Sequence, residues 1–107
     1  MKYLLVYYGG GTPEGEEEQA AVMKAWTEWF TELGPAVTDP GNPFSGKVAS
    51  VGSEGAVEDG PVGEAASGYS LLEAETLEDA SEKAKGCPVI AGGGRVAAQA
   101  AARLQRA

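Results

Sequence analysis

The sequence predicts one α+β domain in which two helices cover one face of an antiparallel sheet. The chain has 107 residues, 43% of them hydrophobic and 22% charged, which is ordinary for one globular domain. Apolar segments follow in the order strand, helix, strand, strand, helix, strand, separated by glycine and proline. This is the order of the split βαβ, or ferredoxin-like (βαββαβ), arrangement. We therefore expect residues 1–107 to form a single domain.

The first strand and helix are predicted from residues 2–33. Residues 2–8 are rich in Tyr, Leu and Val, which favours a strand buried on both faces or at a dimer interface. Thr12-Pro13-Glu14 offers a capping hydroxyl and a proline where no N–H is needed, and so predicts a helix start. The helix should run to about Leu33, because an apolar stripe recurs at helical spacing: Val22, Trp26, Trp29 and Leu33, widened by Ala25 and Phe30. Gly34 and Pro35 end it.

The middle of the chain, residues 35–68, holds most of the glycine and proline. Only short strands fit between these residues, and Ala36–Thr38 and Lys47–Val51 are the candidates. A loop is expected from about Gly52 to Ala66.

The last third predicts a strand, a helix and an ambiguous tail. Gly68–Ala74 is expected to be a strand, and Thr76 with Asp79 three residues later is a capping-box-like helix start. That helix should carry four small or apolar residues: Leu77, Ala80, Ala84 and Cys87. Gly86 and Pro88 end it. Residues 96–104 have helix-forming composition, so propensity alone favours helix there.

Composition and charge exclude several classes of function. The net charge of −8 and the pI near 4.4 argue against nucleic-acid binding, which needs basic groups. The chain has no histidine, which excludes histidine-dependent triads and imidazole metal ligation. Cys87 is the single cysteine, so no intramolecular disulfide or cysteine-rich zinc site can form, which favours a cytoplasmic location. The apolar run 3–8 is too short for a signal segment or a membrane span.

Several segments, taken in order, match the pattern of a known family. They are Lys2–Tyr7, Met23–Trp29, Asp59–Glu64 ahead of Gly68-Tyr69, Leu77–Ala80 and Cys87–Gly94. With these intervals the chain resembles the YCII-related family, in its DGPF-type branch. Val62 and Val89 occupy positions where members often carry Phe and His.

The resemblance implies a dimeric α/β-barrel fold with a small-molecule cleft near the dimer interface. It also implies that about residues 94–101 form a strand, and we prefer this to the helix because tertiary pairing commonly overrides propensity. Some family members occur beside or fused to sigma factors, and some relatives are lyases or isomerases. A second copy packing sheet to sheet would also cover the face that two helices leave bare.

Two carboxylates are the candidate catalytic residues. Asp59 lies in an Asp-Gly-Pro segment with Glu64 five residues later, and such a pair on a loop can share a proton or bind a cationic or hydroxylated ligand. Asp59 is the expected base and Glu64 the group that tunes it. The alternative is structural, because an aspartate at the head of a Gly-Pro turn caps its own backbone.

Candidate ligand-binding residues are Tyr7, Trp26, Trp29 and Arg95. Both tryptophans lie near one face of the first helix, where core packing and a pocket wall are both possible roles. Tyr7 and Tyr8 should point to opposite faces of their strand. Every acidic residue lies at or before Glu82, whereas Arg95, Arg103 and Arg106 make the tail basic, either as charge balance or as an anion or acidic-partner site.

The function expected from this sequence is that of a small-molecule-binding or accessory, regulatory module that works as a homodimer. A lyase or isomerase that uses Asp59 and Glu64 for acid–base chemistry is the alternative. Neither a metal nor a cofactor is expected, and the link to a sigma-factor system rests on family association alone.

Overall fold

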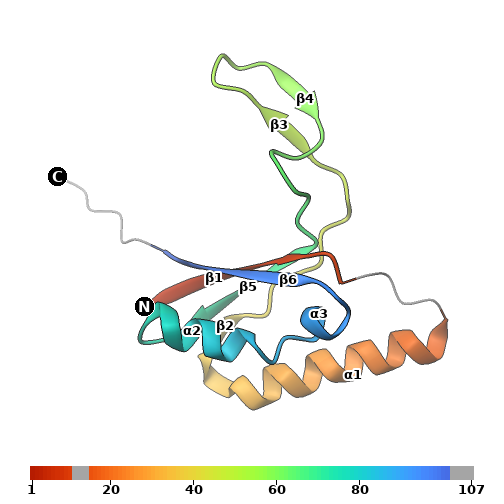
Figure 1. The fold of residues 1–107 in the computed structure, drawn as a ribbon, viewed down its shortest axis with the longest axis vertical. Coiled ribbons are helices and arrows are strands. Elements are labelled where there is room, and N and C mark those ends of the chain that lie inside the picture. The colour runs from red at the N-terminus through yellow and green to blue at the C-terminus, as the bar shows by residue number, and fades with distance from the viewer. Residues whose placement is uncertain (11–14, 102–107) are drawn as a thin grey trace.

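The structure is a computed structural model that describes residues 1–10 and 15–101 (Figure 1). Its elements follow one another as an α+β chain: β1 Lys2–Tyr8, α1 Glu16–Leu33, a 3-10 turn Gly34–Ala36, β2 Val37–Asp39, β3 Ala49–Val51, β4 Val57–Asp59, β5 Gly68–Glu73, α2 Leu77–Ala84, α3 Pro88–Ala91 and β6 Arg95–Ala100. The α+β prediction is confirmed.

The main sheet has four strands in the order β2-β5-β1-β6, and each neighbouring pair is antiparallel. The helices lie on one face of this sheet, as Figure 1 shows. Order and direction are consistent with a ferredoxin-like arrangement, in which the first and third strands of the βαββαβ unit form the centre.

Alternation along β1 decides which side chains enter the core. Tyr3, Leu5 and Tyr7 are almost fully buried and face the helices, whereas their neighbours Leu4, Val6 and Tyr8 are partly exposed on the opposite face. The main core cluster packs this buried face against the helices, and its buried members are Leu5, Tyr7, Trp29, Leu72, Ala84, Cys87 and Val89. The prediction that Tyr7 and Tyr8 face opposite ways is confirmed.

Helix α1 ends as predicted, at Leu33. Gly34 follows it with a positive φ of 59°, and its backbone N–H bonds to the carbonyl of Phe30. The predicted start at Thr12-Pro13-Glu14 lies outside the described residues, and the first described helical residue is Glu16. Among residues 1–10 and 15–101, no helix is long and apolar enough to cross a membrane.

Helix α2 begins with the predicted capping interaction. The Thr76 hydroxyl accepts the backbone N–H of Asp79 at 3.0 Å, while the Asp79 carboxylate accepts that of Glu75 at 3.2 Å. The extension of this helix to Cys87 was wrong. The helix ends at Ala84, and Cys87 instead precedes the short helix α3, which Pro88 begins.

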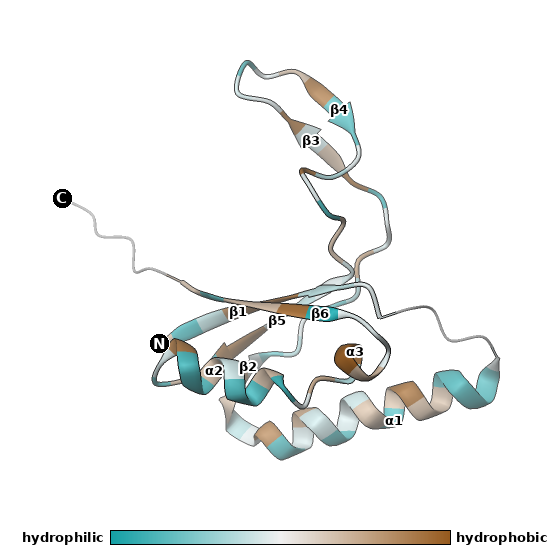
Figure 2. Cartoon of the chain, in the orientation of Figure 1, coloured by the Kyte–Doolittle hydropathy of each residue, from teal (hydrophilic) through white to brown (hydrophobic). Residues whose placement is uncertain are grey.

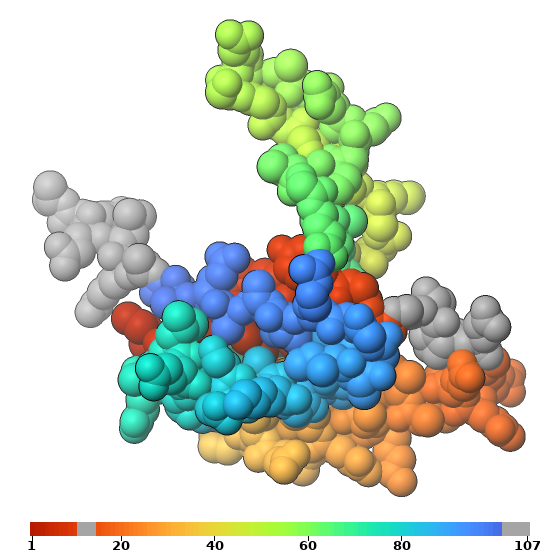
Figure 3. Space-filling model, viewed as in Figure 1, coloured from red at the N-terminus to blue at the C-terminus, as the bar shows by residue number. Residues whose placement is uncertain are grey.

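The segment between β2 and β5 forms a projecting hairpin, here called the arm (residues 44–67). Within the expected Gly52–Ala66 loop, Val57–Asp59 forms strand β4, which pairs with β3 in a sheet of its own. The loop prediction was therefore wrong over these residues. Figures 1 and 3 show the arm standing away from the body, on the side of the sheet opposite the helices. Its cross-strand pair Val51 and Val57 is about two-thirds exposed. Figure 2 shows brown, hydrophobic segments in the region of β3 and β4.

Strand β6 decides between strand and helix for the described part of the C-terminal segment. Residues 95–100 pair with β1, so the strand implied by the family resemblance is confirmed there and the helix favoured by propensity is wrong. Gly94 leads into the strand, and a Cβ on it would lie 2.5 Å from the carbonyl oxygen of Tyr8. Only glycine allows the chain to approach β1 this closely. Arg103 and Arg106, counted in the basic tail, lie outside the described residues.

Candidate functional site

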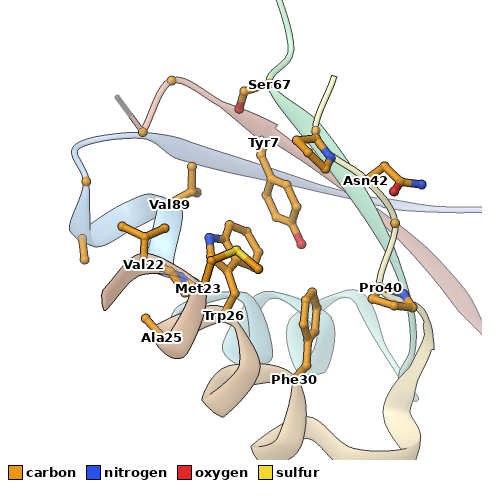
Figure 4. Close-up of a pocket in the computed structure, with 18 of the residues that line it drawn as sticks. Tyr7, Val22, Met23, Ala25, Trp26, Phe30, Pro40, Asn42, Ser67 and Val89 are labelled. Atoms are coloured by element: carbon orange, nitrogen blue, oxygen red, sulfur yellow. The ribbon is translucent and has the colours of Figure 1, made fainter. Parts of the chain in front are cut away.

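The main cavity lies between α1 and the helix-facing side of the sheet, with a volume of about 830 Å³ (Figure 4). Four segments build it: the end of β1, one side of α1, the connection after β2 with the start of β5, and α3. Most of the lining is apolar. Glu18 is the one charged side chain among the described lining residues.

Aromatic rings form the wall between strand and helix. The Tyr7 and Trp26 rings meet edge to face with centroids 5.1 Å apart, and the Phe30 ring lies 5.7 Å from that of Trp26. Figure 4 shows the Tyr7 hydroxyl directed toward the region between Trp26, Phe30 and Pro40. The structure therefore brings two predicted ligand-binding residues, Tyr7 and Trp26, together in one cavity.

The opposite wall is main chain held close to the sheet. Residues 40–43 pass over the start of β5, where a Cβ on Gly41, whose φ is 74°, would overlap the carbonyl oxygen of Tyr69. The backbone N–H of Tyr69 donates to Asn42 O at 3.3 Å, and the N–H of Gly41 donates to the Asp39 carboxylate at 2.8 Å. These contacts fix the position of the cavity wall.

The Tyr7 hydroxyl belongs to a buried hydrogen-bond chain. It donates to Ser70 Oγ at 2.6 Å, and Ser70, which is fully buried, donates to Pro40 O at 2.6 Å. Burial raises the pKa of Tyr7 well above its ordinary value of 10.0, against the opposing effect of the Ser70 hydrogen bond. The phenol is thus neutral at any physiological pH.

Trp29 is a core residue and does not line this cavity. Only 4% of it is exposed, and its indole N–H donates to the carbonyl of Lys83 at 3.2 Å, joining α1 to the end of α2. Its ring packs edge to face on Trp26 with centroids 5.7 Å apart. Of the two roles open to the tryptophans, packing describes Trp29, and Trp26 supplies the cavity wall.

Arg95 and Glu64 form an ion pair away from the cavity. Arg95 is opposite Tyr8 in the β1–β6 register, so both lie on the sheet face that the helices leave bare, and the guanidinium carbon lies 6.0 Å from the Tyr8 ring centroid. Hydrogen bonding to Glu64 raises the pKa of Arg95 further. Arg95 therefore links the base of the arm to β6.

Asp59 is exposed at the end of β4, in the arm, opposite Ala49. No hydrogen bond or ion pair between described residues joins Asp59 to Glu64, and neither carboxylate lines the cavity. The structure thus places the predicted catalytic residues on the arm without bringing them together.

The part of the chain that the structure describes holds no cluster of three or more His, Cys, Asp or Glu side chains fit for a metal ion. Cys87 is buried and free, and burial raises its pKa to about 11. It stays a thiol at neutral pH and is shielded from reagents.

Sequence reasoning missed most of the cavity wall outside α1 and β1. Phe30 was recognised only as part of the apolar stripe, and Val22 likewise. The prolines and glycine of Pro40-Gly41-Asn42-Pro43 predict an interruption of regular structure, yet two prolines around a glycine also indicate a rigid segment that can lie against a sheet. Val89 also lines the cavity. It follows Pro88, which starts a short helix, and this helix start is the sequence signal that could have indicated its position.

A scan against protein-family models gives no match to this chain, and a search of curated proteins gives none either.

Proposed function

We propose that this protein binds an apolar small molecule in the cavity between α1 and the sheet. The observation that carries the proposal is the cavity itself: about 830 Å³, walled by Tyr7, Trp26 and Phe30, with few polar groups. Ligand sites typically measure roughly 300–1,000 Å³ and combine apolar walls with a few fixed polar atoms. The Tyr7 hydroxyl is one such atom, held in place by Ser70.

We propose in addition that the protein works as a homodimer, in the cytoplasm, as the resemblance to the YCII-related family suggests. Support comes from the bare sheet face, where the partly exposed side chains are apolar for the most part: Leu4, Val6, Tyr8, Tyr69, Leu71 and Ala97. A second copy is the natural cover, because a twofold interface uses the same patch on both subunits. An accessory or regulatory role, with its link to sigma factors, rests on family association.

The alternative, a lyase or isomerase that uses Asp59 and Glu64, gains no support from the geometry. Acid–base chemistry needs both groups within hydrogen-bond reach of one substrate. Glu64 is paired with Arg95, and Asp59 lies exposed on the arm. We therefore favour binding over catalysis.

Native mass spectrometry of the purified protein tests both parts of the proposal. We expect a dimer, with additional mass that represents a retained apolar molecule. The cavity is tested with Val22→Phe, which adds bulk to a lining residue, and with Lys24→Phe as the matched control on the same helix, at an exposed position outside the lining. Val22→Phe should abolish the retained mass and Lys24→Phe should keep it. Equal retention by both variants would contradict binding in this cavity.

A further inference from the structure

The hydroxyl chain in the cavity wall has a fixed direction. Tyr7 Oη, Ser70 Oγ and Pro40 O follow one another at 2.6 Å and 2.6 Å. A carbonyl oxygen only accepts hydrogen bonds, so the contact with Pro40 must use the single hydroxyl hydrogen of Ser70. Ser70 then has only lone pairs to offer Tyr7, and the contact between them must use the hydrogen of Tyr7.

Tyr7 therefore has no hydrogen left for a ligand. Its pKa is raised by burial, so the phenol keeps this proton and carries no charge. What its oxygen can still do is accept a hydrogen bond through a remaining lone pair. Because Ser70 donates its hydrogen to Pro40, Tyr7 can act toward the cavity only as a hydrogen-bond acceptor.

The other walls disfavour anionic ligands. An ionised group enters an apolar cavity only at a large free-energy cost unless a partner charge meets it. No Lys or Arg is among the described lining residues, and the chain as a whole carries −8, which disfavours anions. Glu18 is the one lining carboxylate, and it belongs to the first turn of α1. The Tyr7, Trp26 and Phe30 rings favour a flat aromatic partner, which can stack or meet them edge to face.

We propose that the cavity selects an aromatic molecule without negative charge that carries a hydroxyl or N–H donor, whose hydrogen bond the Tyr7 oxygen accepts. This inference rests on the proposed binding function and adds the class of ligand. An ether or ketone of the same size lacks the donor and leaves the Tyr7 lone pair unpaired, which weakens binding.

The test compares beta-naphthol with its methyl ether, two aromatic probes that differ in the hydroxyl donor. Binding is followed by the indole N–H signals of the 15N-labelled protein in NMR titrations. Trp26 lines the cavity, so its indole signal reports occupancy, and Trp26→Phe distinguishes this signal from that of Trp29. We expect beta-naphthol to bind about fivefold more tightly than the ether, the worth of about one hydrogen bond.

Three variants make the test specific. Tyr7→Phe should remove the preference for beta-naphthol while leaving the Ser70–Pro40 bond in place. Tyr8→Phe is the matched control, because it removes a hydroxyl from the next residue, on the opposite face of the sheet, and should keep the preference. Ser70→Ala frees the Tyr7 hydrogen, so binding of methyl beta-naphthyl ketone should improve several-fold over the wild type.

The outcomes separate this inference from the proposed function. Equal affinity of the wild type for naphthol and ether, or a preference that survives Tyr7→Phe, overturns the inference while binding stands. If neither probe shifts the Trp26 signal, the proposed binding function fails, and the inference fails with it.

Discussion

At the scale of single residues, neighbours in the sequence serve opposite sides of the sheet. Tyr7 is buried, bonded to Ser70 and part of the cavity, whereas Tyr8 lies on the bare face beside Arg95. The same division separates Trp26, at the cavity, from Trp29, whose indole is bonded to main chain. A side chain's role follows from its direction more than from its type.

The two tryptophans should therefore differ on substitution. Trp29→Phe removes the hydrogen bond to Lys83 O and part of a buried ring, and should lower the free energy of unfolding by about 1–3 kcal/mol. Trp26→Phe, at a partly exposed ring, should cost less stability and weaken binding of beta-naphthol. Urea unfolding measures the stability change, and isothermal titration calorimetry measures the affinity for beta-naphthol, because Trp26→Phe lacks the indole signal followed by NMR. A larger stability loss for Trp26→Phe would contradict the assignment.

Cys87 gives the protein a predictable response to alkali. Burial raises its pKa from 9.0 to about 11, so the unfolded chain loses the thiol proton first. The stabilisation from this group is complete below pH 9 and is lost as pH rises toward 11, by on the order of 1 kcal/mol. Thermal midpoints measured across this range should fall less steeply for Cys87→Ala. The Tyr7 pKa is also raised, so part of the fall should remain, and identical profiles would contradict the prediction.

At the scale of elements, the arm is held at its root and free along its length. Phe44 N–H donates to Ser67 O at 2.8 Å, the Phe44 ring stacks on Tyr69 with centroids 5.7 Å apart, and the Arg95–Glu64 pair ties the returning chain to β6. Beyond the root, β3 and β4 have no buried side chain. The arm thus depends on its root for its direction.

Arg95→Ala should release the arm without unfolding the body. An exposed ion pair contributes little to global stability, so the thermal midpoint should stay nearly constant. Cleavage after Glu54 or Glu58 by a glutamate-specific protease should become several-fold faster, followed by mass spectrometry of the fragments. Lys85→Ala, which breaks an ion pair with Glu82 elsewhere, is the control and should leave the cleavage rate unchanged. Equal rates for both variants would show that the pair does not hold the arm.

At the scale of the whole molecule, one sheet face carries the helices and the other carries apolar side chains beneath the arm. Val6 is at its centre, between Tyr69 of β5 and Ala97 of β6 in the two registers. A sheet of this size is stable when both faces are covered, which is why we expect a second copy on this face.

Val6→Glu tests this expectation. A carboxylate at the centre of a sheet-to-sheet interface would be buried without a partner, so the dimer dissociation constant should rise at least about tenfold. Thr31→Glu adds the same charge on the exposed side of α1 and should leave the dimer intact. Analytical ultracentrifugation over a concentration series measures both, and a wild type that is monomeric throughout would refute the dimer.

The sequence allowed strands β1 and β5 and both principal helices to be predicted, because their signals are local. The apolar stripe of α1 and the Thr76 cap of α2 needed only nearby residues. Strand β6 required the family resemblance, since an alanine-rich segment is a strand only where β1 offers a partner. Strand β4 and the ion pair of Glu64 with Arg95 depend on where the chain turns back on itself, and no local sequence pattern predicts this.

The candidate site divides in the same way. Tyr7 and Trp26 were predicted from strand and helix periodicity, and the structure places both in the cavity. The wall from Pro40 to Pro43 could not be predicted, because its position depends on the close passage of Gly41 over Tyr69. Asp59 and Glu64 were selected by type and spacing, which say nothing about where a long hairpin carries them.

The same backbone segments line the cavity and join the arm to the body. Residues 40–43 and 67–69 are lining segments and also the two roots from which the arm rises. A molecule in the cavity would touch both roots, so its binding free energy also opposes their separation. Amide deuterium uptake at Phe44 and Ser67 should then slow when beta-naphthol is present, while uptake at Gly55, in the hairpin tip, stays the same. Through this coupling, an occupied cavity would hold the two ends of the arm together where they join the body, and would leave the hairpin tip unchanged.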